Sequence, residues 1–337
     1  MSVTAHTTTV VEGPSTHSLT HSLALGFIVG GILLGYLASY FLISRTGGWR
    51  AMYALSLPVA AALLAGMSWL PPSPRWLLLS SRREEAEAAL RRLRAGAVGP
   101  ELEGMEAALA RERSGKGPPA AAGPWAALLE RRSVRALSIG LSLIVFQQIT
   151  GQPSVLYYAT KIFQDAGFPA AEQATAVSVG LGVFKLLMTF VAVAFVDSAG
   201  RRPLLLGGIS VILLSLVVLG AAASASASSA TALVSVAALL LYVGAYQVSF
   251  GPIAWLVVGE IFPLSIRNQA VAISTLTNFG SNAVVSQVLP SVQASLGQGN
   301  TYFVFAAIAA VALAVVAAIV PETKGRTLEE IQDILDD

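Results

Sequence analysis

The chain alternates between long uncharged apolar stretches and short joints that hold its charges, glycines and prolines. Each apolar stretch is close to the ~20 residues that an α-helix needs to cross a hydrocarbon core about 30 Å thick. The pattern therefore predicts an all-α, polytopic helical membrane protein with eight transmembrane helices. The eight predicted spans are residues 19–43, 52–70, 134–158, 175–196, 203–223, 232–259, 269–290 and 302–320.

Composition supports this prediction. The chain is 55% apolar and 12% charged, whereas a soluble domain has about 25% charged residues. The alternative, that the stretches are core helices of a large soluble protein, is disfavoured because apolar runs of about 20 residues are typical of membrane spans. The absence of cysteine excludes disulfides, thiolate chemistry and cysteine-based metal sites.

Basic residues are distributed unevenly over the joints. With both termini on the cytoplasmic side, seventeen of the 21 Lys and Arg residues fall on that side, and only Arg45, Arg50 and Lys161 fall on the other. An excess of Lys and Arg in cytoplasmic loops is the positive-inside signature of membrane proteins. The sequence therefore predicts a multi-pass protein with both termini in the cytoplasm.

The predicted spans form a group of two and a group of six, separated by a polar segment. Mixed charges with Ala and Leu at helical spacing over 82–94 and 100–113 predict amphipathic helices at the cytoplasmic surface; a solvated linker is the alternative. The Thr/Ser-rich start has no Lys or Arg, unlike a signal peptide. The predicted order is a disordered tail (1–18), two transmembrane helices (19–70), a helical linker (71–133), a six-helix half (134–320) and a cytoplasmic tail (321–337).

Three spans carry helix breakers or clusters of polar side chains at membrane depth, where backbone groups must be paired internally. Amides offer a donor and an acceptor together, as a sugar hydroxyl requires, and an aromatic ring packs against the C–H face of a pyranose. The cluster predicts a cavity for a neutral polyhydroxylated ligand; the alternative is that the amides only join helices and Trp255 faces lipid. The residues are Gln147, Gln148, Thr150, Gly151, Gln152, Pro153, Tyr157 and Tyr158 in the third span, Gly251, Pro252 and Trp255 in the sixth, and Thr275, Thr277, Asn278, Ser281 and Asn282 in the seventh.

Lys185 is a charged residue inside a span. It lies twelve residues before Asp197, which is about 18 Å along a helix that rises 1.5 Å per residue. A lone cation at this depth is costly and points to a lined cavity or a partner. The alternative is that the ammonium reaches an interface through local water.

The sequence shows no pattern typical of an enzyme. His6, His17 and His21 all precede or begin the first span, and neither a nucleophile–base set nor a metal-ligand cluster is visible. We therefore expect no catalytic residues, no metal and no cofactor.

Six motifs occur in an order that resembles the sugar porter branch of the major facilitator superfamily. Among its members, the chain is most similar to plant and algal vacuolar or plastidic hexose carriers and xylose-symporter-like proteins. The motifs are Pro71-Pro-Ser-Pro74-Arg75-Trp76, Gln147-Gln148-Ile-Thr-Gly151 leading to Tyr157-Tyr158, Asp197-Ser-Ala-Gly200-Arg201-Arg202, Gly251-Pro252-Ile-Ala-Trp255, Glu260-Ile-Phe-Pro263 with Arg267, and Pro321-Glu-Thr-Lys-Gly325.

The resemblance implies roles for these residues. Gln147 and Gln148 would hydrogen-bond the sugar, Trp255 would stack on it, and Asn278 would add a polar contact. A gate would include Tyr157, Tyr158, Gly251 and Pro252. A cytoplasmic charge cluster that breaks and reforms would include Asp197, Arg201, Arg202, Glu260 and Arg267.

The resemblance also implies a partial fold and an activity. The family has twelve spans in two halves, and the eight seen here resemble the fifth, the sixth and the whole second half, so we expect an N-terminally truncated form. The implied function is transport of a hexose or pentose by alternating access, with a coupling proton in full-length relatives. A non-transporting sugar sensor or a regulatory partner of a longer relative is the alternative.

The expected partners are a small-molecule sugar, the lipid bilayer, and a second copy or a full-length relative, but not nucleic acid. The sequence leaves open whether the membrane is vacuolar, plastidic or the plasma membrane.

Overall fold

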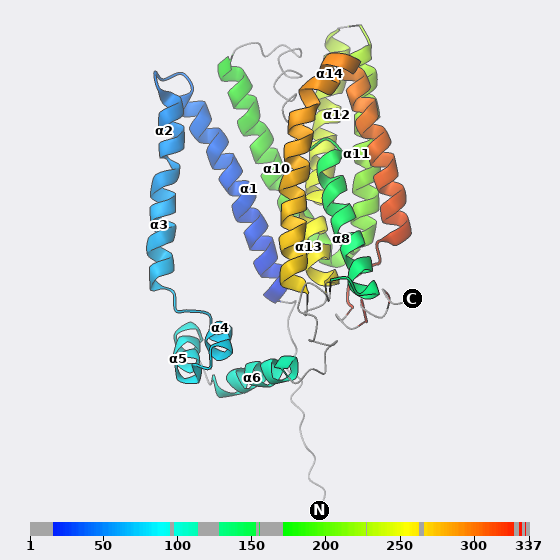
Figure 1. Ribbon diagram of the computed structural model, residues 1–337. Helices are drawn as coiled ribbons and strands as arrows, with labels where there is room; N and C mark the ends of the chain where they lie inside the picture. The colour runs from blue at the N-terminus through cyan, green and yellow to red at the C-terminus, as the bar shows by residue number, and fades with distance from the viewer. Residues whose placement is uncertain are drawn as a thin grey trace, which may run out of the picture.

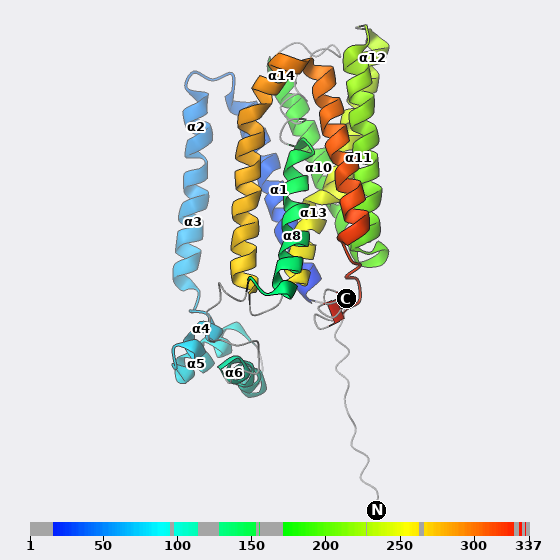
Figure 2. The same cartoon turned by 45° about the vertical axis from the view of Figure 1, so that its right-hand side comes forward.

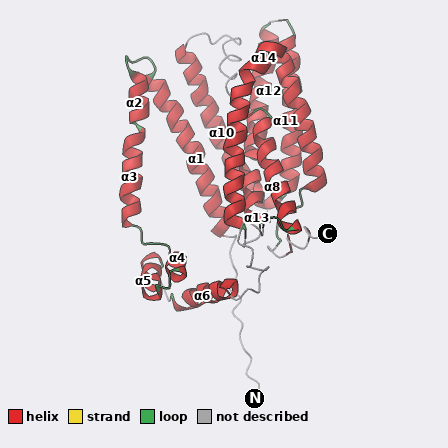
Figure 3. Ribbon diagram, viewed as in Figure 1, coloured by secondary structure: helices red, strands yellow, loops and turns green. Residues whose placement is uncertain are grey.

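The computed structural model describes residues 16–94, 98–113, 128–152, 155, 171–226, 228–262, 266–326, 330–331 and 334. Within these residues the regular secondary structure is helical throughout (Figure 3), so the predicted all-α class is confirmed. The helices are α1 (Thr16–Leu42), α2 (Gly48–Ala54), α3 (Ser56–Trp69), α4 (Pro74–Leu79), α5 (Arg83–Leu93), α6 (Gly99–Arg113), α8 (Arg131–Ile149), α10 (Ala171–Ala199), α11 (Arg201–Ser224), α12 (Ser229–Val248), α13 (Phe250–Ile261) and α14 (Arg267–Ile319).

Each predicted span overlaps an apolar helix, although the third, 134–158, extends beyond the end of α8 at Ile149. In the described parts of the chain, five stretches are long and apolar enough to cross a membrane: Gly48–Trp69, Ala176–Val196, Arg201–Ser224, Ser229–Ile261 and Arg267–Ile319. Two shorter apolar helices, Gly26–Leu42 and Ser133–Ile149, match the first and third predicted spans.

The seventh and eighth predicted spans share α14. This helix has 53 residues, or about 80 Å, which is more than twice the thickness of a hydrocarbon core. Gly297 lies inside it with non-helical angles, φ 79° and ψ 166°. Figure 2 shows the chain reversing direction within α14, so that its two halves run in opposite directions.

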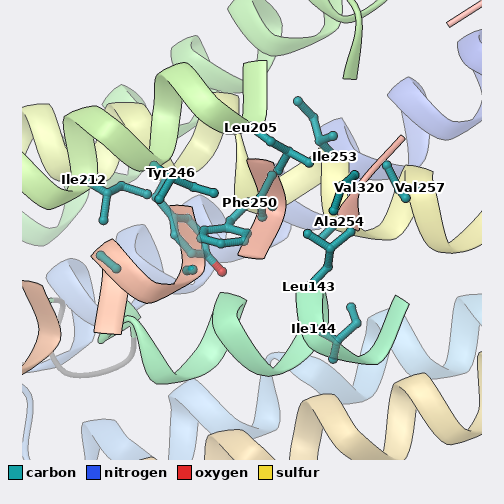
Figure 4. Packing of buried hydrophobic residues seen from close by; sticks show 14 of the residues in the cluster. Leu143, Ile144, Leu205, Ile212, Tyr246, Phe250, Ile253, Ala254, Val257 and Val320 are labelled. Atoms are coloured by element: carbon teal, nitrogen blue, oxygen red, sulfur yellow. The ribbon is translucent and has the colours of Figure 1, made fainter. Parts of the chain in front are cut away.

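Helices α8 and α10–α14 gather into one bundle, and α1 lies against α10 (Figure 1). The bundle core is apolar. Leu143 of α8 lies close to Ala254 of α13, and Leu205 of α11 lies on the other side of α13 (Figure 4); all three are fully buried. We call the end of the bundle where α11 begins and α13 ends the charged end.

Helix α3 stands at the edge of the molecule and has no buried residue. Its Leu64 and Trp69 are 75% and 86% exposed. A soluble protein rarely leaves so long an apolar surface open to water. With α2, this helix forms the stretch Gly48–Trp69, which is long and apolar enough to cross a membrane.

Helices α4, α5 and α6 lie beyond the charged end and have a small core of their own (Figure 1). Leu78, Leu90 and Leu102 are buried in it, while Arg83 forms an exposed ion pair with Glu106 at 2.7 Å. Helices α5 and α6 cover the segments 82–94 and 100–113, over which two helices were expected.

Helices α12 and α13 form one membrane-length segment that is interrupted at Ser249. The residue has φ −113° and ψ −94°, outside the helical region. Helix α11 passes so close to this break that a Cβ added at Gly208 would lie 2.2 Å from the Ser249 Cβ. A glycine at 208 is thus needed for close packing at the break.

We expect Gly208→Ala to destabilise the protein, whereas Gly207→Ala has little effect. The first adds a methyl group where no space exists, which costs about 1–3 kcal/mol; the second adds one at a position with nothing within 4 Å. Thermal unfolding of the purified protein in detergent measures both. Equal melting temperatures for the two variants would contradict the close packing at Ser249.

Candidate functional site

Two interrupted helices face each other in the bundle. Helix α8 ends at Ile149, and Gly151 follows with φ 96°. A Cβ at Gly151 would lie 2.8 Å from the ring of Phe305. The carbonyl of Thr150, freed by the end of the helix, accepts a hydrogen bond from the Tyr242 hydroxyl at 3.3 Å. This hydrogen bond pairs a backbone carbonyl for which lipid offers no partner.

Gln147 joins three helices at the second interruption. Its Nε2 donates to the Phe250 carbonyl at 2.6 Å and to the Gly251 carbonyl at 3.3 Å, at the start of α13. Its Oε1 accepts from Asn278 Nδ2 of α14 at 3.0 Å. The Gln147 side chain is only 3% exposed, so its amide is largely committed to holding α8, α13 and α14 together.

Gln148 makes a second contact with α14. Its Oε1 accepts from Asn282 Nδ2 at 3.0 Å. Asn278 and Asn282 are four residues apart and therefore share one face of the helix. Across the described residues, no partner is found for Gln148 Nε2, Asn278 Oδ1 or Asn282 Oδ1. One donor and two acceptors of neutral amides are thus left for another group.

Trp255 lies one helical turn after Gly251, whose carbonyl binds Gln147. Its side chain is half-buried and packs against the apolar core. Pro252 is buried in the first turn of α13, where its missing N–H matters least. The other two predicted gate residues, Tyr157 and Tyr158, lie outside the described residues.

At the charged end, two of the five predicted cluster residues pair with each other. Arg201 Nη2 of α11 is 3.0 Å from Glu260 Oε1 of α13, and Arg201 Nη1 donates to the Val196 carbonyl at 3.2 Å. Arg202 and Arg267 instead donate to backbone carbonyls, of Ala317 at 2.6 Å and Phe262 at 3.2 Å. The side chain of the fifth, Asp197, is outside what the structure describes.

Glu322 and Thr323 belong to this network but were not among the predicted cluster residues. The Glu322 carboxylate accepts from the backbone N–H of Arg201 at 3.0 Å and of Arg202 at 3.1 Å. Thr323 Oγ1 donates to Glu260 Oε2 at 2.6 Å. The motif at 321–325 was the signal in the sequence that could have pointed to Glu322 and Thr323. A motif does not show a contact with residues 120 positions earlier in the chain.

Glu322 caps the N-terminus of α11. Burial would raise its pKa, but backbone N–H groups of Lys324, Arg201, Arg202 and Thr323 outweigh burial and hold the pKa below the ordinary value. Gly200 precedes α11 with φ 90°, and a Cβ there would lie 2.7 Å from Glu322 Oε2. Glycine therefore provides both the backbone angle and the room for the carboxylate.

Lys185 is buried in α10, with 6% of its surface exposed. Its carbonyl accepts from Thr189 Oγ1 at 2.9 Å, and Gln247 Nε2 of α12 donates to the same Oγ1 at 2.9 Å. Sequence reasoning missed Thr189 and Gln247, which read as ordinary residues of apolar spans. Three or more His, Cys, Asp or Glu side chains placed to hold a metal ion occur nowhere in the described chain.

Comparison with known sequences finds similarity to transporters over almost the whole chain. The family profile described as "Sugar (and other) transporter" matches residues 19–335. The D-xylose-proton symporter-like 3, chloroplastic, of Arabidopsis thaliana is 48% identical over 317 residues, which is 91% of this chain and 56% of the relative. The galactose-proton symporter of Escherichia coli strain K12 is 34% identical and is covered to 64%.

Solved structures agree with the sequence comparison. The proton:xylose symporter XylE, a major facilitator superfamily protein bound to 6-bromo-6-deoxy-D-glucose, matches with a TM-score of 0.76 and 30% identity. The match covers 94% of this chain and 67% of that one. The chain thus spans about three-fifths of the length of the curated relatives that it matches.

We expect Gln147→Leu to lower the melting temperature markedly. The variant removes the bonds to the Phe250 and Gly251 carbonyls and leaves the Asn278 amide without its partner; one such unpaired buried group costs about 1–3 kcal/mol. Gln287→Leu, at an exposed position of α14, is the matched control and should change little. Unfolding followed by tryptophan fluorescence in detergent compares the two; similar melting temperatures would rule out the bridging role.

We expect the stabilisation from Glu322 to disappear in acid. Its folded-state pKa is lowered, so the stabilisation is complete above the ordinary pKa of about 4.5 and is lost as the pH falls through the folded value. The melting temperature of Glu322→Gln should lie below that of the wild type at pH 7, and the difference should shrink below about pH 4.5. Glu103→Gln, an exposed change on α6, serves as control; a difference that stays constant as the pH falls below 4.5 would exclude the cap.

Proposed function

This chain belongs to the family of sugar (and other) transporters, and on that premise we propose that it moves a monosaccharide, a hexose or a pentose, across a membrane by alternating access. It is a multi-pass membrane protein with a partial major facilitator fold. Its relatives are transporters rather than enzymes. The alternative of a non-transporting sensor or regulatory partner is not favoured by these similarities.

The observation that carries the proposal is the set of neutral polar atoms beside the two helix breaks. Gln148 Nε2, Asn278 Oδ1 and Asn282 Oδ1 offer one donor and two acceptors, which is the complement of a hydroxylated ring. Trp255 supplies an aromatic surface from α13. Gln147, with its amide committed to three helices, positions this set.

Alternating access requires contacts that break and reform. The Arg201–Glu260 pair sits at helix ends, where the Glu260 side chain retains 26% exposure. The Arg201 side chain is 10% exposed, so separation of this pair requires water to reach both charges; a shift of α11 against α13 at this end would admit it. Thr323 holds the second oxygen of Glu260 and would release with it.

Proton coupling is proposed only by likeness to relatives named as proton symporters. Placing both termini in the cytoplasm rests on the distribution of Lys and Arg. A plastid membrane is one candidate, since one relative is named chloroplastic. The domain boundaries, and pairing with a second copy or a longer relative, remain predictions.

We expect Trp255→Ala and Gln148→Ala each to reduce sugar transport roughly tenfold, because each removes about 1 kcal/mol or more of contact with the sugar. Gln287→Ala, on the exposed face of α14, should leave transport unchanged. Uptake of radiolabelled D-xylose and D-glucose in a host without its own carriers measures this.

Binding of the same sugars to the purified protein is measured in parallel, because it does not depend on a complete transport cycle. Protein abundance at the membrane is the control for each variant. Failure of the wild-type chain both to bind and to transport any hexose or pentose would refute the proposed function.

A further inference from the structure

Lys185 has no acidic residue beside it within the apolar segments of the described chain. The apolar segments 26–42, 133–149, 176–196, 201–224, 229–259 and 267–319 contain no Asp or Glu. The side chain is nevertheless 94% removed from solvent. A charged group held in this way at membrane depth costs several kcal/mol unless something compensates it.

The helices packed around Lys185 present neutral groups. On the α1 side, Tyr36 and Leu33 lie against Gly182, one turn from Lys185. On the α12 side, the Phe184 ring lies against Gly244, and Gln247 donates to Thr189. No hydrogen bond or ion pair of the Lys185 ammonium is found among the residues that the structure places.

A series of contacts leads from Thr189, one turn after Lys185, toward the amide site. Gln247, which reaches Thr189 one turn from Lys185, precedes Phe250 by three residues, and the Phe250 carbonyl binds Gln147. A helical side chain leans toward the N-terminus of its helix. The ammonium therefore reaches away from the charged end, on the face of α10 that lies between α1 and α12.

We infer that Lys185 recognises the carboxylate of an acidic monosaccharide, a hexuronate or an aldonate, while the amides bind its hydroxyls. This inference rests on the proposed function and names its substrate class. One ammonium balances one carboxylate, and the amide atoms left at Gln148 and Asn282 are neutral. A phosphate dianion would leave a net negative charge in the membrane, and phosphate sites are usually met by several cationic donors.

The test is equilibrium binding of radiolabelled D-glucuronate and D-glucose to the purified full chain in lipid nanodiscs. The wild type should bind D-glucuronate at least tenfold more tightly than D-glucose. Lys185→Arg should keep this preference because it keeps the charge. Lys185→Gln should lose it, so that the two sugars bind within about threefold of each other.

The outcomes separate the two proposals. Binding of D-glucose by the wild type without preference for D-glucuronate, or a preference that survives Lys185→Gln, overturns the inference and leaves the proposed function intact. Displacement of D-glucuronate by acetate or D-glucose 6-phosphate as readily as by unlabelled D-glucuronate shows a simple anion site and also overturns it. Binding of no saccharide by any variant refutes both proposals.

Discussion

Everything in this bundle depends on pairing backbone polar groups where lipid offers no partner. A continuous helix meets that requirement alone, but α8 stops at Thr150–Gly151 and α12 stops at Ser249. At the first break, Tyr242 binds the exposed carbonyl; at the second, Gln147 binds the carbonyls of Phe250 and Gly251. An unpaired group in hydrocarbon costs several kcal/mol. Tyr242 therefore pairs a carbonyl that the end of α8 exposes, whereas Gln147 holds α8 against the first turn of α13.

The same pairing explains why the polar site lies where it does. Once Gln147 is fixed by backbone carbonyls and by Asn278, the next residue, Gln148, is directed to Asn282 on the next turn of α14. Trp255 follows on α13 one turn beyond the carbonyl that Gln147 holds. The hydrogen bonds that join the helices thus leave neighbouring amide atoms available. These atoms provide a site for a small polar molecule where the interrupted helices meet.

The spans and the polar residues at the site were predictable because hydropathy and residue type are local properties of the chain. Their partners were not predictable, since Asn282 contacts Gln148 across 134 residues of sequence.

The predicted end of a span at Pro290 also differs from the structure, in which α14 continues to a break at Gly297. Neighbouring helices in a membrane can satisfy the backbone group that a proline frees, whereas the non-helical angles of Gly297 break the helix. Glu322 was missed for the same reason as Asn282: its role depends on a helix N-terminus far away in sequence.

The capping of α11 by Glu322 has a consequence for biosynthesis. Glu322 is translated 121 residues after Arg201, so α11 enters the membrane before its carboxylate exists. Its first N–H groups depend on water at the membrane surface while α12, α13 and α14 are inserted. Closure of this end is therefore a late event of assembly, completed only after the last helix has been made.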